Sequence, residues 1–277
     1  MQLKLEHVTV RYSDSEKILD NIDLAVPQGQ FLGVTGKAGC GKTTLLETIA
    51  GFHKPENGLV LLDDQNIYEK KFDSHSFRKR LQVVFQFPEN QFFESEIWQE
   101  IGFGLKNISI SPEEKERKII EAMQAVGLDT NEMKHTSPFA LSGGQKRRLA
   151  LACALVIGPE ILLLDEPFSG LDGNGQNQIV SILKDLHRNG TTIIMVSHDP
   201  NILCEVSDKI IVLNDGIIVL NDIPSHVLAD KVLCNQLGIG QPETKITADL
   251  IGLDLDEDFT YTNFIKKIEK KYLSEHD

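Results

Sequence analysis

The stretch Gly36-Lys-Ala-Gly-Cys-Gly-Lys-Thr43 decides the fold of this chain. It fits the pattern G-x-x-x-x-G-K-[ST] at every position, after a predicted strand over 30–35 and before a helix that begins near Lys42. Its glycines let the backbone wrap a phosphate group, and the N–H groups of the loop point inward with the helix N-terminus behind them. Residues expected to hold the nucleotide here are Gly36, Lys37, Ala38, Gly39, Cys40, Gly41, Lys42, Thr43 and Thr44.

Two side chains of the loop have further expected roles. Lys42 is predicted to place its ammonium on the β and γ phosphates of ATP, and Thr43 to offer its hydroxyl to Mg²⁺. The acidic partner is the pair Asp165-Glu166, which closes an apolar strand over 161–164. An aspartate at such a strand end orients Mg²⁺, and the following glutamate polarises the attacking water.

The remaining pattern predicts a mixed α/β protein with one large domain over 1–220. A mostly helical insertion is expected over 87–155, and Asn214-Asp215-Gly216 between apolar runs predicts a β-hairpin. Residues 221–277 are predicted to form a small C-terminal extension. The other expected elements are strands within 1–35 and over 59–62, 81–85 and 191–196, and helices over 174–189, 225–237 and 262–273.

Charge and composition limit the function. The chain has 277 residues and a net charge of −13, which argues against a nucleic-acid partner, because such binding needs a basic footprint. The basic clusters Arg78-Lys79-Arg80 and Lys146-Arg147-Arg148 are interpreted mainly as solvated helix faces. The cysteines are scattered without a zinc spacing, which favours free thiols in a reducing cytosol, and no apolar run is long enough to span a membrane.

The segment Leu141-Ser-Gly-Gly-Gln145 resembles the signature of the ABC ATPase family. Its residues Ser142, Gly143 and Gly144 offer a hydroxyl and free amides at the start of a helix, which is a second anion cradle. The resemblance implies that this cradle, with Gln145, binds the γ-phosphate of ATP held by another subunit. It also implies a P-loop NTPase (RecA-like) core with an antiparallel β-subdomain, a helical signature subdomain and a head-to-tail dimer of two ATPase chains, homomeric or heteromeric.

Other positions match landmarks of the same family in the same order. By resemblance, Tyr12 stacks on adenine, and Gln86 senses both Mg²⁺ and a membrane partner. Asp172, in Ser169-Gly-Leu-Asp172, lies in the loop that crosses the dimer interface, and His198 is the switch histidine that contacts the γ-phosphate. Asp165, Gln86 and Thr43 are then the expected Mg²⁺ ligands, and Glu166, His198, Lys42 and Gln86 the catalytic set.

A narrower resemblance is to the ATPases of energy-coupling factor importers, which take up vitamins or transition-metal ions. It is carried by the segments Val84–Phe93, Ile101–Asn107, Ser137–Arg148 and Leu237-Gly-Ile-Gly-Gln-Pro-Glu243. It implies integral membrane subunits docking near Gln86–Phe93, a peripheral position on the cytoplasmic face of the membrane, and an extension that helps to hold two ATPases together. The phenylalanines 87, 92 and 93 then form a groove rim, with a core position as the other interpretation.

Two positions depart from the family pattern. Cys40 replaces a commoner serine, and a thiol near a helix N-terminus predicts a lowered pKa and sensitivity to thiol reagents. Gly173 stands where a proline often follows Asp172, a change expected to matter little. Three alternatives stay open: an ATPase of another ABC importer class, a soluble ABC protein acting on DNA or the ribosome, and a catalytically idle subunit. The acidic charge disfavours the second, and the intact Glu166 and His198 oppose the third.

Overall fold

The computed structural model describes residues 2–12 and 17–272, and its contacts divide the chain into two compact units. The first unit comprises Met1–Asn66 and Met195–Asp277, and the second comprises Ile67–Ile194. Strand β8 (Thr192–Val196) begins in the second unit and ends in the first. The first unit therefore contains the phosphate loop and the C-terminal extension, which are far apart in the sequence.

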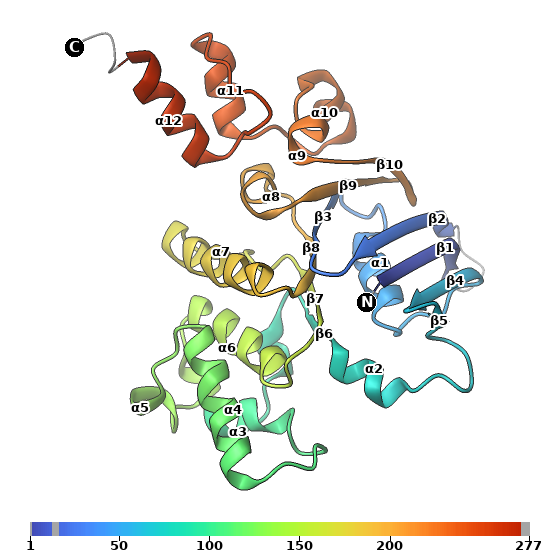
Figure 1. Cartoon of the computed structure of the whole chain (residues 1–277), viewed down its shortest axis with the longest axis vertical. Coiled ribbons are helices and arrows are strands. Elements are labelled where there is room, and N and C mark those ends of the chain that lie inside the picture. Colours follow the sequence, from blue (N-terminus) through green and yellow to red (C-terminus); the bar gives the residue numbers. More distant parts are fainter. Residues whose placement is uncertain (1, 13–16, 273–277) are drawn as a thin grey trace. The chain divides into compact units, whose positions relative to one another are not determined.

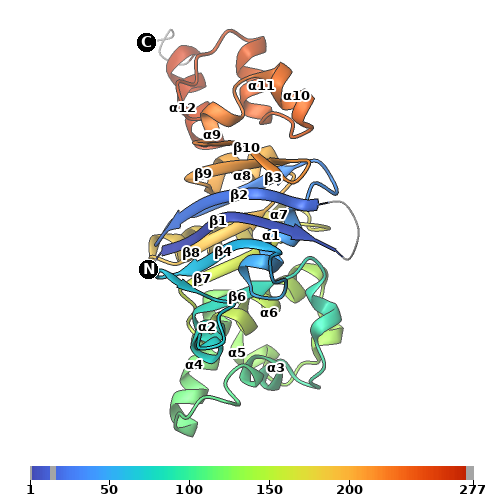
Figure 2. The same ribbon diagram turned by 90° about the vertical axis from the view of Figure 1, so that its right-hand side faces the viewer.

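The first unit contains two groups of strands (Figure 1). Its strands are β1 (Gln2–Arg11), β2 (Lys17–Pro27), β3 (Phe31–Gly36), β4 (Asn57–Leu62), β5 (Gln65–Asn66), β9 (Lys209–Asn214) and β10 (Ile217–Asp222). β1 pairs antiparallel with β2 and β4 (Figure 2), and the four-stranded sheet has the order β2-β1-β4-β5. β9 pairs parallel with β3 and antiparallel with β10. The antiparallel sheet and the hairpin at Asn214–Gly216 confirm the predicted mixed architecture.

Strand β3 delivers the phosphate loop to helix α1 (Lys42–Ile49). All six residues of β3 are buried, as expected for a strand covered on both faces. Helix α1 contacts β2 and β3, and its Leu45, Leu46 and Ile49 are at most 2% exposed. The burial of this apolar side holds the helix, and the loop at its N-terminus, against the strands of the same unit.

The rest of the first unit is helical. It consists of α8 (Pro200–Val206), α9 (Pro224–Val227), α10 (Lys231–Leu237), α11 (Glu243–Leu250) and α12 (Tyr261–Tyr272). Helix α9 contacts β9, β10 and α8, and α11 contacts α12 (Figure 1). Two helices were expected after β10, over 225–237 and 262–273. The structure divides the first into α9 and α10 and adds α11, whose buried residues are only Thr244 and Ala248, so that its apolar pattern is weak. Leu273, the predicted end of the last helix, lies outside the described residues.

The second unit is mainly helical and includes a parallel pair of strands. Its helices are α2 (Ser74–Arg80), α3 (Ile97–Phe103), α4 (Pro112–Ala125), α5 (Thr130–Met133), α6 (Gly143–Leu155) and α7 (Gly173–Arg188), with short 3-10 turns over Pro88–Gln91 and Pro138–Ala140. Strands β6 (Leu81–Val84) and β7 (Ile161–Asp165) pair in parallel. The helical character predicted for 87–155 is confirmed, while its status as a separate subdomain stays a prediction.

Helix α2 is an element that the sequence pattern does not predict. Only Phe77 is buried in it, so no apolar stripe marks the helix. Its start is set by Asp73, whose carboxylate accepts hydrogen bonds from the backbone N–H groups of His75 and Ser76, both at 3.1 Å. The last turn contains Arg78, Lys79 and Arg80, which suits the negative end of a helix dipole.

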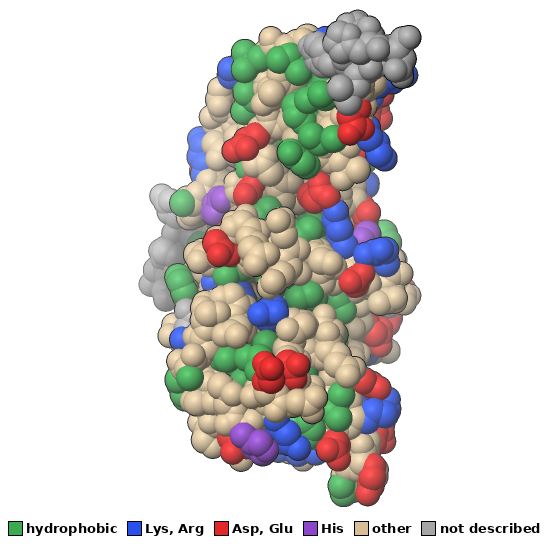
Figure 3. All heavy atoms as spheres, turned by 90° about the vertical axis from the view of Figure 1, so that its left-hand side faces the viewer, with side chains coloured by type: hydrophobic (Ala, Val, Ile, Leu, Met, Phe, Trp, Pro, Cys, Tyr) green, Lys and Arg blue, Asp and Glu red, His purple; other side chains and the backbone are tan. Residues whose placement is uncertain are grey.

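The surface combines charges of both signs. On the face in Figure 3, acidic and basic side chains are interspersed. Within residues 2–12 and 17–272, the helices are too short or too polar to cross a bilayer.

Candidate functional site

The phosphate loop combines tight packing with an open concave side. Gly36, Gly39 and Gly41 have φ values of 142°, 78° and 105°, a region that favours glycine. A Cβ at Gly36 would collide with the carbonyl of Leu213, and one at Gly41 would lie 2.7 Å from the carbonyl of Ile18, whereas one at Gly39 would meet nothing within 4 Å. The glycines at 36 and 41 are therefore needed for packing, and the middle of the loop is left open for a ligand.

Lys42 is folded back onto the loop. Its side chain is 6% exposed, and Nζ donates hydrogen bonds to the carbonyls of Gly36 and Lys37, both at 2.8 Å. Nζ also lies 3.9 Å from Sγ of Cys40, its third hydrogen-bond partner, and a thiol sulfur is a weak acceptor. A phosphate oxygen is a much stronger acceptor for an ammonium, so the loop holds Lys42 ready for an anion.

Tyr12 lies beside the helix that follows the loop. Its hydroxyl is 3.3 Å from Oγ1 of Thr44 and donates to Oε2 of Glu47 at 3.2 Å. The ring contacts His53 edge-on, with centroids 4.4 Å apart. The structure thus brings Tyr12 to the helix that follows the phosphate loop, as the expected adenine contact requires, and stacking on adenine stays a prediction.

His198 is held next to the strand that carries the loop. Ser197 is 1% exposed, and its N–H donates to the carbonyl of Val34 on β3 at 3.1 Å. The next residue, His198, is exposed, and Asp199 caps α8 by accepting from the N–H groups of Asn201 and Ile202. The turn around His198 is therefore fixed to β3 by a hydrogen bond from the preceding residue.

In the second unit, Asp165 and Glu166 follow the buried strand β7. Asp165 is 5% exposed, and Glu166 has a positive φ of 48°, which is strained for a residue with a side chain. Such strain costs on the order of 1–3 kcal/mol and concentrates at functional sites. Ser169 N–H donates to the carbonyl of Glu166 at 3.2 Å, so the tight turn that imposes this backbone is closed by a hydrogen bond.

The signature segment forms an open cap on α6. Ser142 accepts a hydrogen bond from Gln145 N–H at 3.3 Å, and the Gln145 side chain accepts from Ser142 N–H at 2.9 Å. A Cβ at Gly143 would meet nothing within 4 Å, and one at Gly144 only Leu171 at 4.0 Å. The helix start is therefore exposed and free of covering atoms, while Gln145 is occupied by the cap.

Arg147 is a buried cation beside candidate site residues, and the sequence analysis misses it. It is 6% exposed, and its guanidinium donates to the carbonyl of Gln86 and, at 3.1 Å, to the carbonyl of Ser169. Interpreting Lys146-Arg147-Arg148 as a solvated face is therefore wrong at Arg147.

This buried cation joins the signature helix to two loops, the loop of Gln86 and the loop that leads to Asp172. The Asp172 carboxylate in turn caps α7 by accepting a hydrogen bond from Gly175 N–H at 2.8 Å. A charged residue type gives no indication of burial. The one signal in the sequence is that Arg147 lies one and two helical turns before Leu151 and Ala154, which are buried on the same side of α6.

Replacing Arg147 by alanine is expected to destabilise the chain by about 3 kcal/mol, because two backbone carbonyls lose a charged donor. Lys146→Ala is the matched control, and it should change stability by no more than about 0.5 kcal/mol. Urea unfolding followed by circular dichroism measures both. Equal stability losses in the two variants would contradict the role given to Arg147.

Cys40 corrects one sequence-based prediction. The thiol is 6% exposed, and burial raises its pKa, with the Lys42 ammonium opposing this only in part. The expected lowered pKa at a helix N-terminus is therefore wrong, because desolvation outweighs the favourable charge. All four cysteines are free, and burial also raises the pKa of Cys204 to about 12.

We expect Cys40 to react with iodoacetamide more slowly at pH 7 than a cysteine in an unfolded peptide, because the thiolate is the nucleophile. The rate should rise with pH as the thiol ionises. Mass spectrometry of peptides after timed labelling measures it, and urea-denatured protein is the control in which all four cysteines react alike. Faster labelling of Cys40 in the native chain than in urea would refute the raised pKa.

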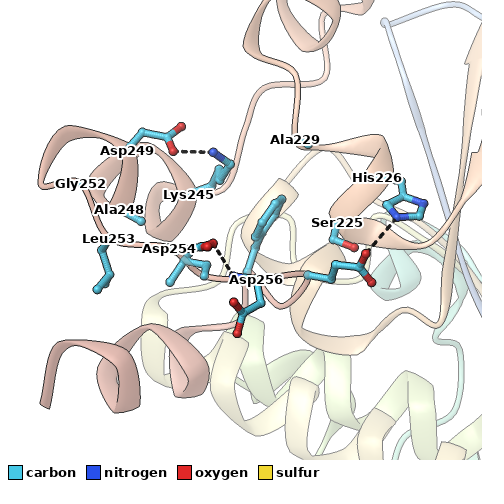
Figure 4. A pocket seen from close by; sticks show the side chains of 13 residues that line it. Ser225, His226, Ala229, Lys245, Ala248, Asp249, Gly252, Leu253, Asp254 and Asp256 are labelled. Carbon is cyan, nitrogen blue, oxygen red and sulfur yellow. Dashed lines mark hydrogen bonds and ion pairs between the residues drawn. The ribbon is translucent and has the colours of Figure 1, made fainter. Parts of the chain in front are cut away.

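A separate cavity lies within the C-terminal extension and has a volume of about 540 Å³ (Figure 4). Its charged lining is largely paired: Lys245 contacts Asp249 at 2.5 Å, and Nε2 of His226 lies 3.7 Å from Glu257. None of the described residues that line it belongs to the phosphate loop. This cavity is a feature of the extension and not the nucleotide site.

The predicted site residues thus form two groups. The first unit holds Tyr12, the phosphate loop and His198, and the second holds Gln86, Asp165, Glu166, Ser142–Gln145 and Asp172. Within each unit the side chains lie on the ends of strands or the starts of helices, where parallel α/β proteins bind ligands.

Residues 19–169 match the model of the family described as ABC transporter. The chain is 38% identical over 248 residues to the energy-coupling factor transporter ATP-binding protein EcfA2 of Clostridium tetani, covering 88% of this chain and 86% of that protein. It is 36% identical over 275 residues to EcfA2 of Clostridium acetobutylicum, covering 96% of each.

Solved structures agree. CbiO1 from Clostridium perfringens, described as part of the ABC transporter complex cbiONQ, superimposes with a TM-score of 0.77 at 31% identity, covering 89% of this chain and 98% of that one. The ATP-binding cassette MJ0796, solved as a dimer in a post-hydrolysis state with ADP and Pi, gives a TM-score of 0.72 at 28% identity, covering 80% of this chain and 98% of that one.

The chain is therefore an ATP-binding cassette and belongs to the ABC transporter family. Within that family it belongs with the ATP-binding proteins of energy-coupling factor transporters.

Proposed function

We propose that the chain is the ATP-hydrolysing subunit of an energy-coupling factor importer. It works as one half of a dimer of ABC ATPases bound to membrane subunits on the cytoplasmic face of the membrane. The cargo class is a vitamin or a transition-metal ion, selected by the membrane subunits. The −13 net charge and the mixed charges of Figure 3 favour this over a nucleic-acid partner.

One observation carries the proposal: the chain contains two separate devices for phosphate. The first is the phosphate loop with the buried Lys42. The second is the start of α6 at Ser142–Gly144, where a Cβ placed on Gly143 would meet no atom within 4 Å. One ATP needs one loop, so the second device is available to the γ-phosphate of ATP on another chain. Closure of the dimer then depends on ATP, because the contacts of this cradle require the phosphate.

The donor set fits Mg²⁺ held mainly by the nucleotide. Thr43, Gln86 and Asp165 supply hydroxyl, amide and carboxylate oxygens, the hard ligands that Mg²⁺ prefers. The described residues contain no cluster of three or more His, Cys, Asp or Glu side chains able to hold a metal. A site with one carboxylate suits an ion that takes its other ligands from phosphates and water. When bound, Mg²⁺ offsets phosphate charge.

Hydrolysis is assigned to Glu166, Lys42 and His198. Glu166 accepts a proton from water as that water attacks the γ-phosphorus, and the bond from phosphorus to the β–γ bridging oxygen breaks to release ADP and phosphate. Lys42 and His198 offset negative charge on the transferred group. The backbone of Glu166 is fixed by the hydrogen bond from Ser169 N–H, and the Lys42 ammonium by two carbonyls, so both are positioned before the reaction.

The docking surface for the membrane subunits is assigned to the second unit, near Gln86–Phe93. Phe92 is 9% exposed and belongs to the core, whereas Phe87 and Phe93 are 52% and 58% exposed. Phe93 meets Phe103 edge-on with centroids 4.6 Å apart, beside a cavity of about 230 Å³ lined by Val84, Phe92, Phe103 and Ile157 among others. An exposed aromatic rim around a hollow suits an apolar helix end from a partner.

The experiment is a pull-down of the tagged chain from gently solubilised host membranes, with mass spectrometry of the captured proteins. A polytopic membrane protein, with or without a second ABC ATPase, is the expected result and distinguishes a heterodimer from a homodimer. A small substrate-binding membrane protein in the complex identifies the cargo class. Capture of soluble or nucleic-acid partners alone would overturn the transport role and leave the ATPase assignment standing.

A matched pair of variants locates the docking surface. Phe93→Ala removes an exposed ring at the proposed rim, and Phe139→Ala removes an equally exposed ring, also 58%, on the turn before the signature segment. Phe93→Ala should reduce recovery of the membrane subunit, while Phe139→Ala should leave it intact. Equal recovery with both would place the docking surface elsewhere.

A further inference from the structure

We propose that the segment Leu237–Glu243, here named the brace, positions the phosphate loop and the turn after His198 of its own chain. The brace connects α10 to α11 in the C-terminal extension. The inference rests on the proposed function, since it concerns the same nucleotide site. Gly238 and Asn201 are assigned as positioning residues; neither needs to touch ATP.

The first contact is between Gly238 and Lys37. A Cβ placed at Gly238 would lie 3.0 Å from Cγ and 3.2 Å from Cε of Lys37, so the aliphatic stem of this lysine lies directly over the Gly238 backbone. The carbonyl of Lys37 in turn accepts a hydrogen bond from Nζ of Lys42 at 2.8 Å. A single residue of the phosphate loop thus contacts the brace through its side chain and the phosphate-binding ammonium through its backbone.

The second contact is with the turn after His198. Oδ1 of Asn201 accepts a hydrogen bond from the backbone N–H of Glu243 at 2.8 Å. A Cβ at Gly240 would lie 3.7 Å from Cγ of Pro200, so the brace also packs on the first residue of α8. Only Asp199 separates this contact from His198, the predicted γ-phosphate sensor.

The brace is itself held firmly. Ile239 is 4% exposed, and its N–H donates to the carbonyl of Cys234 at 3.1 Å. The side chain of Gln241 donates to the carbonyls of Leu228 and Ala229 at 3.0 and 2.7 Å. Because Ile239 is buried and the middle of the brace is hydrogen-bonded to residues of the extension, a displacement of the extension moves the brace as a body. The extension therefore acts on ATP affinity from within the chain, in addition to any contact it makes with another subunit.

The test compares two glycines with nearly equal positive φ angles. Gly238 has φ 65° and Gly252, also in the extension, has φ 62°. Alanine is similarly strained at both, but a Cβ at Gly252 meets nothing within 4 Å, whereas one at Gly238 meets Lys37. Affinity for a fluorescent ATP analogue, kcat, KM and the melting temperature are measured for each variant and for the unaltered full chain.

We expect Gly238→Ala to weaken binding of the ATP analogue by about fivefold or more, and Gly252→Ala to leave it unchanged, at similar melting temperatures. In a Lys37→Ala background the effect of Gly238→Ala should vanish, because the collision partner is gone. Equal affinities of the two glycine variants, with normal binding by the unaltered chain, would overturn the brace alone. Failure of the unaltered chain to bind the analogue would instead overturn the proposed function.

Asn201 provides an independent variant. Asn201→Ala removes the acceptor for Glu243 N–H, and Asn201→Asp keeps an acceptor oxygen at the same position. Weaker ATP binding in the alanine variant, restored by aspartate, is the expected result. The same loss in both variants, or in neither, would remove the second contact from the proposal.

Discussion

A chain carrying Glu166→Gln is expected to bind ATP and to hydrolyse it at least about 100-fold more slowly, because a carboxylate acting as general base contributes this much or more. The amide keeps the size and shape of the side chain but cannot accept the proton of the attacking water. ATP should therefore persist in the site, and the protein should accumulate as a closed dimer. Phosphate release and sedimentation velocity with ATP measure the two effects.

The control for this prediction is Glu160, which lies before strand β7, whereas Glu166 follows it. Glu160 precedes strand β7 and forms an exposed ion pair with Arg80 at 3.0 Å, so Glu160→Gln makes the same chemical change away from the site. It should leave hydrolysis unchanged, since exposed pairs of this kind contribute about 1 kcal/mol or less to stability. Hydrolysis by Glu166→Gln at the rate of the unaltered chain would sink the role assigned to Glu166.

Lys42→Ala is expected to weaken ATP binding by about 100-fold, since hydrogen bonds to charged groups contribute about 1.5–3 kcal/mol each and about 1.4 kcal/mol is tenfold in affinity. Lys42 is buried and its ammonium is held by the carbonyls of Gly36 and Lys37, so the loop fixes the position of this charge. Equilibrium titration with a fluorescent ATP analogue measures the loss.

Lys54→Ala, an exposed lysine shortly after α1, serves as the control of equal charge change. Its affinity for the analogue should match that of the unaltered chain. Melting temperatures of both variants separate loss of binding from loss of folding. A Lys42→Ala chain that stays folded and binds the analogue normally would show that the phosphates lie elsewhere.

Elements with a strong local pattern were predictable. The phosphate loop, strand β3 and helix α1 follow from glycines at fixed spacing between an apolar strand and an amphipathic helix, and the structure places them within a residue or two. The hairpin at Asn214–Gly216 follows from turn residues that tolerate a positive φ, and Asp215 and Gly216 have φ values of 47° and 77°. Helices α2 and α11 escaped because each buries too little apolar surface to leave a periodic signal.

The candidate site also contains residues that local sequence pattern predicts and residues that it does not. Candidate residues in short motifs could be chosen from the sequence, since each motif binds its group through adjacent backbone and side-chain atoms. The role of Arg147 could not, because its two acceptors, at Gln86 and Ser169, come from segments far away in the chain. The pKa of Cys40 was wrongly predicted for a similar reason: the helix start is local, whereas the burial that raises the pKa comes from the surrounding fold.

The sequence by itself determined the class of the protein and selected its candidate phosphate loop, signature segment and hydrolysis residues, because these depend on contiguous residues in a fixed order. Only the tertiary structure decided which charges are buried, which phenylalanines face solvent, and which distant segment supports the nucleotide site. The contact between Gly238 and Lys37 joins residues far apart along the chain, and no spacing rule relates them. Burial and long-range packing depend on the whole fold, since a side chain loses water only when other segments cover it.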